Sequence, residues 1–309
     1  MRKLLLLSPV LLLLLLSARK ENTNALTAKS IEQQLCLIPA QELDTLTYPA
    51  FYDQPPTAPK VKIDSFYLSC YEVTNGMYVE YLFDLQRHDT AAYRKALPDT
   101  MVWREKLAYN EPYVDYYLRH PAYRDYPVVG VTQEQALAYC DWLTKRYNAF
   151  PKKKFSNVRF DLPTKNEWWA AANGGMQYPL FSWGGPYLHN SKGMRLANYR
   201  YINEASIRRD TINGKIVYVS SNGGDDIGIA GMLNDAADIT APVYSYWPNA
   251  YGLYNMNGNV EELVKEPGVT KGGSWRDPGY YLMNRVEERY DPQHSASPER
   301  GFRVCMRIR

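Results

Sequence analysis

The residue types that commonly carry catalysis are sparse in this chain of 309 residues. Its four histidines are widely separated, at His88, His120, His189 and His294. A zinc-protease helix needs two histidines four residues apart, so their spacing excludes that chemistry. The sequence also has no GxSxG turn, no phosphate-binding loop with its lysine, and no GxGxxG after a strand. Serine-hydrolase and nucleotide-binding motifs are therefore missing from the sequence.

Four cysteines are the other residues that could do chemistry: Cys36, Cys70, Cys140 and Cys305. None of them lies in a CxxC pair, which excludes a zinc ribbon and a thioredoxin-type site. In an exported chain they could form two disulfides, with three possible connectivities. The alternative is that they are buried free thiols. The spacing alone leaves both interpretations open.

Composition and charge place the chain among ordinary globular proteins. Apolar residues make up 45% of it and charged residues 22%, which argues against wholesale disorder. The formal charge is +3, and it falls to +1 (3 minus 2) if Arg2 and Lys3 are lost with a leader. A general nucleic-acid binder needs a basic stripe that displaces counterions, so we expect no nucleic-acid partner.

Capping patterns indicate the elements that must position any site. Thr132–Gln135 and Thr164–Glu167 are capping boxes, and apolar residues at helical spacing follow the first of them. Thr74 can cap a third helix. From the second box to Arg309, Gly and Asn are frequent, strands are short and no long helix is indicated. The pattern predicts an α+β fold with few helices and many ordered loops.

The first residues are typical of an export signal. Met1 to Lys3 form a charged start, and the apolar run from Leu4 to Ala18 is shorter than the roughly 20 residues of a comfortable membrane span. We predict a signal peptide at 1–18 and a linker at 19–35, with a retained anchor as the alternative. Arg19 stands where a lipoprotein would carry its lipidated cysteine, so lipidation is not expected.

Six sequence blocks in order resemble the formylglycine-generating enzyme (sulfatase-modifying factor) family. They are FYLSCYEVTN (66–75), YPVVGVTQEQALAYCDWL (126–143), RFDLPTKNEWWAAANGG (159–175), PVYSYWPNAYGLYNMNGNVEELV (242–264), KGGSWRDPGYYL (271–282) and GFRV (301–304). The resemblance implies a C-type-lectin-like, formylglycine-generating-enzyme fold over residues 36–309. It agrees with the loop-rich α+β pattern, which the capping boxes predict independently.

The resemblance implies two structural calcium sites. The first would use Asn255, Gly258, Val260 and Glu262, with side-chain oxygens from Asn and Glu and backbone carbonyls from Gly and Val. Such oxygen donors suit a hard cation. The second would use Asn198, Tyr199, Asp235 and Ala237. The alternative at both places is a loop that satisfies its own hydrogen bonds.

The same resemblance fails at the catalytic centre. Oxidase members of the family hold copper(I) with two cysteines after the GGS turn, since soft thiolates are the ligands this ion needs. Asp277 and Leu282 occupy those positions here. We therefore expect no copper and a non-catalytic relative.

The family also implies a disulfide between Cys140 and a cysteine close to the final strand, for which Cys305 is the candidate. Cys305 lies one residue beyond the family position. A shift of one residue turns a strand side chain to the other face of its sheet.

A finer resemblance concerns three segments, at 97–131, 183–201 and 271–282. They are similar to the gliding-motility lipoproteins of Bacteroidetes, types K and J, with K closer. This implies an exported, non-catalytic structural or interaction protein, in the periplasm or on the periplasmic face of the outer membrane. Its expected partner is a ring protein of the type IX secretion apparatus, in a homo- or hetero-oligomer. The alternatives are a formylglycine-generating-type oxidase, or a glycan- or peptide-binding module for which Trp275 and Tyr280 supply aromatic rings.

The segment from Leu97 to Tyr126 interleaves aromatic residues with arginines, the types enriched at binding hot spots. The interface candidates are Trp103, Tyr113, Tyr116, Tyr117 and Arg119. The alternative is that the aromatic rings cover the domain's own core while the arginines face solvent.

Overall fold

The computed structural model describes residues 26–44, 60–104, 110–201, 207–212, 215–220 and 239–309. The predicted signal peptide at 1–18 and the Arg19 position lie outside the described residues. So do Asp235 and Ala237, two of the residues expected in the second calcium site. Within the ranges given above, no helix combines the length and the apolar character that a membrane crossing requires.

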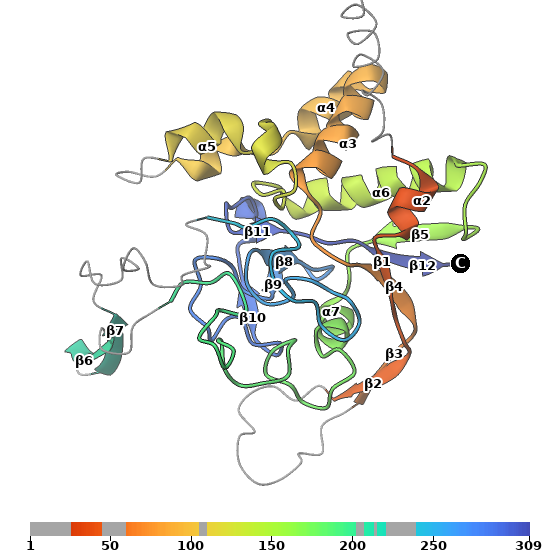
Figure 1. Cartoon of the computed structure of the whole chain (residues 1–309). Coiled ribbons are helices and arrows are strands. Elements are labelled where there is room, and N and C mark those ends of the chain that lie inside the picture. Colours follow the sequence, from red (N-terminus) through yellow and green to blue (C-terminus); the bar gives the residue numbers. More distant parts are fainter. Residues whose placement is uncertain (1–25, 45–59, 105–109, 202–206, 213–214, 221–238) are drawn as a thin grey trace, which may run out of the picture.

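One antiparallel sheet contains both the first and the last strand of the domain (Figure 1). Its strand order is β1-β4-β12-β5, where β1 is Leu35–Ile38, β4 is Phe66–Ser69, β12 is Cys305–Ile308 and β5 is Val158–Asp161. In the middle of the sheet, Cys305 stands opposite both Leu68 and Asp161. The two ends of the domain are therefore joined through hydrogen-bonded strands.

Helices supply the core on the two faces of this sheet. Leu143 of α6 (Gln133–Ala149) belongs to the same buried cluster as Val304 and Met306. Trp168 of α7 (Lys165–Ala172) belongs to a second cluster with Cys305 and Leu68. Successive side chains of a strand point to opposite faces, so β12 contributes to both clusters in turn.

The second half of the fold is built from short strands and long loops. A four-stranded sheet has the order β10-β9-β8-β11, with β8 at Glu261–Leu263, β9 at Val269–Lys271, β10 at Glu287–Arg289 and β11 at Arg300–Gly301. Strand β11 runs parallel to β8, and the other pairs are antiparallel. Two hairpins pair β2 (Gln41–Asp44) with β3 (Lys60–Ile63) and β6 (Ile207–Ile212) with β7 (Lys215–Ser220). The predicted α+β class is confirmed.

The predicted helix starts are also confirmed. Thr74, Thr132 and Thr164 precede α3 (Asn75–His88), α6 and α7. Each threonine hydroxyl accepts the backbone N–H three residues later at 3.2 Å, which satisfies a donor that has no partner inside the helix. The remaining helices are short: α2 (Ala28–Glu32), α4 (Thr90–Ala96), η1 (Thr100–Trp103), α5 (Glu111–Tyr116), η2 (Pro121–Tyr123) and η5 (Pro292–His294).

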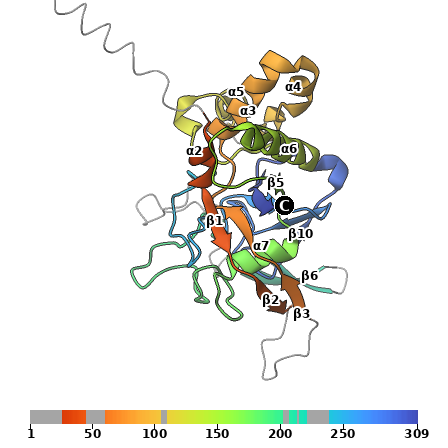
Figure 2. The ribbon, with the colours of Figure 1, turned by 90° about the vertical axis from the view of Figure 1, so that its right-hand side faces the viewer.

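The predicted linker is wrong in its second half. Residues 28–32 form α2, and Ala28 and Ile31 are buried in the same cluster as Tyr147 of α6. Figure 2 shows α2 beside α6 and β1. The polar composition of this segment led to the prediction of a linker, because only two of the residues of α2 face the core.

The disulfide candidate Cys140–Cys305 is also wrong. The structure bonds Cys36 to Cys70, whose Cα atoms lie 5.6 Å apart, and leaves Cys140 and Cys305 as buried thiols. Cys140 packs in the cluster of α6, whereas Cys305 points to the cluster of α7. The central sheet separates the two thiols because the one-residue offset turned Cys305 to the opposite face.

We predict that replacing Cys36 and Cys70 by Ser lowers the free energy of unfolding by about 3–4 kcal/mol, because the bond closes a long loop in the unfolded chain. Urea denaturation of the oxidised protein and of the double variant measures the difference. The wild type in reducing buffer is the matched control, and it should unfold at the midpoint of the variant. If reduction leaves the wild-type midpoint unchanged, the assigned pairing is wrong.

Candidate functional site

The turn after β9 carries Asp277 and Leu282, the two residues that stand at the copper positions expected from the family resemblance. Gly272 has a φ of +96°, and a Cβ there would lie 2.9 Å from the carbonyl oxygen of Met256, so only glycine fits. Asp277 closes the turn, because its Oδ2 accepts the backbone N–H of Ser274 at 2.7 Å and also the hydroxyl of Ser274. The Asp277 carboxylate therefore has a structural hydrogen-bonding role.

Leu282, at the second copper position, is a core residue. It is fully buried in one cluster with Phe181, Ala197 and Tyr199. Its backbone carbonyl accepts the side-chain amide of Asn257, which fixes the segment that carries it. The pocket that a second thiolate would need is thus filled by hydrocarbon.

The two free thiols cannot replace the missing pair. Cys140 and Cys305 lie in the two clusters on either side of the central sheet. Burial raises the pKa of both thiols, that of Cys305 to about 12. Neutral thiols in apolar surroundings are poor nucleophiles and poor ligands. The chain therefore does not reproduce the soft dithiolate that copper(I) requires.

A group of carboxylates lies near Asp277. Glu261, Asp277, Glu288 and Glu299 lie close enough to influence one another, with Arg300 paired to Glu261. Burial, reinforced by Asp277 and Glu261, raises the pKa of Glu288 to about 8. Its Oε1 is buried and has no hydrogen-bond partner among the described residues. Glu288 is therefore protonated in the folded protein at neutral pH.

The asparagine-rich loop before β8 is held in a left-handed conformation. Asn255, Gly258 and Asn259 have φ values of +49°, +83° and +70°. A side chain on Gly258 would collide with the carbonyl oxygen of Asn198, which accepts the Asn259 N–H at 2.8 Å. The loop that the family uses for calcium is thus built here from residues that tolerate positive φ.

Glu262 at the end of this loop is committed to an ion pair. Its Oε1 accepts Nε and Nη2 of Arg303 at 2.8 and 2.6 Å, while Oε2 accepts the same Nε and the Trp168 indole N–H, both at 2.7 Å. A carboxylate offers about four lone-pair sites, and these four contacts occupy them. Glu262 is therefore not a free metal ligand.

Glu72 is the carboxylate that contacts Asn255. Its Oε2 lies 3.5 Å from Asn255 Nδ2, and its Oε1 accepts Asn259 Nδ2 at 2.9 Å. Burial raises the pKa of Glu72 to about 8, against the opposing effect of Arg303. The Oδ1 atom of Asn255 is buried and accepts no hydrogen bond from the part of the chain that the structure describes. An unsatisfied oxygen beside a carboxylate fits a hard cation.

Some of the expected calcium ligands could bind an ion, and others are already bonded to other residues. Asn255 fits the ion through its side-chain oxygen, and Gly258 and Val260 can offer only their backbone carbonyls. Glu262 is held by Arg303 instead. At the second site, Asn198 Oδ1 is likewise buried without a partner in the described ranges. Tyr199 is buried beneath Arg195, whose guanidinium lies 5.3 Å from its ring centre.

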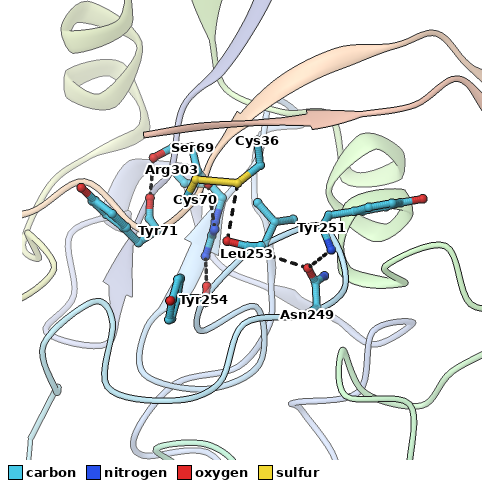
Figure 3. Close-up of a disulfide and its surroundings, with 10 residues drawn as sticks. Cys36, Ser69, Cys70, Tyr71, Asn249, Tyr251, Leu253, Tyr254 and Arg303 are labelled. Atoms are coloured by element: carbon cyan, nitrogen blue, oxygen red, sulfur yellow. Dashed lines mark hydrogen bonds between the residues drawn. A yellow bond between two sulfur atoms is a disulfide. The ribbon is translucent and has the colours of Figure 1, made fainter. Parts of the chain in front are cut away.

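The disulfide lies against the segment that leads into the asparagine-rich loop, as Figure 3 shows. The Tyr254 N–H donates to the Cys70 carbonyl at 2.7 Å, and Cys36 Sγ lies 3.5 Å from the carbonyl oxygen of Gly252. Arg303 donates to the carbonyls of Ser69 and Tyr254, at 3.1 and 2.9 Å. The disulfide and the arginine therefore hold the same two segments together.

The interface candidates divide between core and surface. Trp103 and Tyr117 are buried, with their ring centres 4.6 Å apart, so the interface prediction is wrong for them. Tyr113 is half-buried against Trp103. Tyr116 is 56% exposed and Arg119 is exposed, so both can meet a partner. Buried and exposed aromatic residues occur within one helical turn, so their spacing in the sequence could not show which of them face the core.

The chain belongs to the family of the sulfatase-modifying factor enzyme 1-like domain, whose family model matches residues 27–308. It is 28% identical over 260 residues to the formylglycine-generating enzyme of Mus musculus, covering 78% of this chain and 56% of the relative. It is 29% identical over 194 residues to the inactive C-alpha-formylglycine-generating enzyme 2 of Bos taurus, covering 59% and 50%. The chain spans about half the length of these curated relatives.

Solved structures confirm the formylglycine-generating-enzyme-like fold. PvdO from Pseudomonas aeruginosa matches with a TM-score of 0.54 and 20% identity, covering 89% of this chain and 94% of that one. Treponema denticola variable protein 1 matches with a TM-score of 0.53 and 17% identity, covering 88% and 94%. At these identities the likeness concerns the fold alone.

Sequence reasoning missed two residues of the site, Glu72 and Arg303. Both stand inside blocks that carry the family resemblance, FYLSCYEVTN and GFRV. A charged residue within an otherwise apolar block was the available signal. Buried charges need partners, so Glu72, Arg303 and Glu262 could have been grouped on that ground.

We predict that Glu288→Gln removes part of the pH dependence of stability. The folded protein keeps a proton on Glu288 up to about pH 8, whereas the unfolded chain releases it near the ordinary pKa of 4.5. The free energy of unfolding of the wild type therefore falls as the pH rises through this window. Denaturant titrations at about pH 4, below the unfolded pKa, and at about pH 9 should show the variant matching the wild type at low pH and exceeding it at high pH. Glu134→Gln on the exposed surface of α6 is the control, and equal slopes for all three proteins would contradict the assignment.

Proposed function

We propose that this chain is a non-catalytic, exported structural or interaction protein of the cell envelope. The observation that carries the proposal is the chemistry of the two copper positions. Asp277 is a hard ligand bound to its own turn, and Leu282 is a buried hydrocarbon. Copper(I) needs soft thiolates, so the reaction of the oxidase members has no metal centre to proceed from.

A loss of catalysis on this fold has a precedent among the relatives. One relative is named an inactive C-alpha-formylglycine-generating enzyme 2, and this chain matches it at 29% identity over 194 residues, against 28% over 260 residues for the mouse enzyme. Family membership therefore does not by itself imply activity.

We place the protein in the gliding-motility or type IX secretion apparatus, in contact with a ring protein of that apparatus. The support is the resemblance of 97–131, 183–201 and 271–282 to the gliding-motility lipoproteins. Exposed Tyr116 and Arg119, on and just after α5, offer a surface of the kind that protein partners use. Tyr116 is packed edge-on to His120, which limits its freedom and so lowers the entropy cost of binding.

A glycan- or peptide-binding module is the second candidate function. It is favoured by exposed aromatic side chains, among them Tyr280, three residues after Asp277 in the chain and 51% exposed. Trp275 is less suited than the sequence suggested, because it is stacked on Trp103 and carries Arg276 above its ring. A glycan array without binding above background would remove the glycan version of this candidate.

We also propose that calcium is bound at the Asn255 loop. The side-chain oxygen of Asn255 and the carbonyls of Gly258 and Val260 would hold the ion, next to the Glu72 carboxylate. Its role would be structural, because it would satisfy a buried side-chain oxygen that has no partner among the described residues.

We predict that the tagged protein, crosslinked in native envelopes, recovers ring components of the secretion apparatus in stoichiometric amounts. The double variant Tyr116→Ala/Arg119→Ala should bind this partner roughly thirtyfold more weakly, as loss of a hot spot does. Val79→Ala, which trims a different exposed side chain on α3, is the control. Mass spectrometry of the crosslinked material measures recovery.

Two results would overturn the scaffold proposal. One is recovery of the protein alone from a soluble fraction. The other is copper-dependent oxidation of a cysteine-containing peptide by the purified protein, which would restore the oxidase alternative.

We predict that calcium raises the thermal unfolding temperature relative to a chelator. An ion at a hundredfold excess over its Kd adds about 2.7 kcal/mol to the free energy of unfolding. Asn255→Gly keeps the positive φ but removes the ligand oxygen, so its unfolding should not respond to calcium. Asn157→Gly, at another positive-φ asparagine on the surface, should respond like the wild type. Equal responses of all three proteins would contradict a site at Asn255.

A further inference from the structure

Three segments meet at one end of the central sheet: α2, the loop at 150–157 and the end of β12. Glu32 of α2 joins the first two, because its Oε1 accepts the Tyr147 hydroxyl and the Lys154 N–H, both at 2.6 Å. The Arg309 N–H donates to the carbonyl of Asn157 at 2.9 Å, which joins the third. Figure 2 views this end of the molecule, with the C-terminus near the centre. We call this surface the basic face.

The basic face carries a strong local positive charge. Residues 150–157 include three lysines and no acidic residue. Four exposed cations lie on the three segments: Lys29, Lys152, Lys154 and Arg309. Glu32 offsets one of these charges, because the two donors that it accepts are neutral groups. Asp161 of β5 is buried and paired with Lys265 at 2.6 Å and with Arg159 at 3.9 Å, so it does not offset the others.

Apolar groups are interspersed with these charges. Lys154 lies over the half-buried ring of Phe155, with its Nζ 5.0 Å from the ring centre. Ile308, next to Arg309, is 54% exposed. Long cationic side chains above apolar groups are typical of surfaces that meet lipid headgroups, because the stems rest on hydrocarbon while the charges reach the phosphates.

The position of the basic face along the chain favours the same partner. Helix α2 begins at Ala28, ten residues after the apolar run that ends at Ala18. Ten residues span at most about 36 Å. The basic face therefore begins within a short tether of the most membrane-compatible segment of the sequence. The backbone N–H of Leu26 is bonded to Glu80 at 2.8 Å, which fixes the point where the chain enters the domain.

We propose that the basic face docks on a phospholipid bilayer with anionic headgroups. The exposed lysines and Arg309 contact the phosphates, and Ile308 and Phe155 provide the apolar contact at the interface. The inference rests on the proposed envelope location for its biological setting, but the interaction depends only on the charges and can be tested alone.

The test uses the full chain and two kinds of vesicle. One kind is phosphatidylcholine alone, and the other contains about 30% phosphatidylglycerol, whose charge attracts basic surfaces. The two kinds of vesicle differ only in headgroup charge, so any apolar contribution is common to both and the difference between them isolates the electrostatic part. We expect flotation to recover more protein with the anionic vesicles, and the difference to vanish at high salt.

Matched variants locate the effect on the molecule. Lys152→Gln/Lys154→Gln should weaken the anionic-lipid preference about thirtyfold, since each lysine near such a surface contributes about a fivefold factor. Lys62→Gln/Lys192→Gln removes two exposed lysines outside the basic face and should leave the preference unchanged. Equal recovery with both vesicles, or equal loss in the two variants, would overturn the proposal. Neither result would affect recovery of protein partners in the crosslinking experiment, so failure of the two proposals is distinguishable.

Discussion

The buried ion pair between Arg303 and Glu262 is the interaction on which the rest of the structure depends. Their side chains are 0% and 1% exposed, and every donor and acceptor in the pair has a partner. Arg303 also donates hydrogen bonds to the carbonyls of Ser69 and Tyr254. One guanidinium therefore joins the end of β4, the segment before the asparagine-rich loop and β8. Breaking such a pair costs about 3–5 kcal/mol, because it leaves an uncompensated buried charge. The loop-rich half of the fold is thus organised around a polar centre, with apolar clusters on its flanks.

This polar centre is separate from the two positions that the family resemblance assigns to copper. The residues that hold the loops together are Arg303, Glu262, Glu72 and Asn259, and none of them occupies a copper position. Asp277 and Leu282 sit at the surface turn and in a separate cluster, where a carboxylate or a hydrocarbon can replace a thiolate without disturbing the ion pair. The ion pair that holds the loops together therefore does not depend on the residues at these two positions.

Much of the fold could be predicted, and the failures at the candidate site have a common cause. Three helix caps and the α+β class followed from local patterns, since a cap is decided within four residues. The disulfide could not be predicted in the same way. Which thiols meet depends on the face to which each strand residue points, and the alternation placed Cys305 away from Cys140. The aromatic interface failed for the same reason, because burial of Trp103 and exposure of Tyr116 depend on tertiary packing.

By itself, the sequence determined the family, the helix starts, the absence of the common catalytic motifs, and the presence of Asp277 and Leu282 at the positions that the resemblance assigns to copper ligands. These are matters of residue type and short-range spacing, which need no knowledge of distant contacts. Only the tertiary structure decided that Cys36 bonds to Cys70, that Glu262 forms an ion pair with Arg303, and that α2 and the 150–157 loop lie together on one basic face. Each of these joins segments far apart in the chain, and such pairings are fixed by burial and by which face of a strand or helix a side chain occupies.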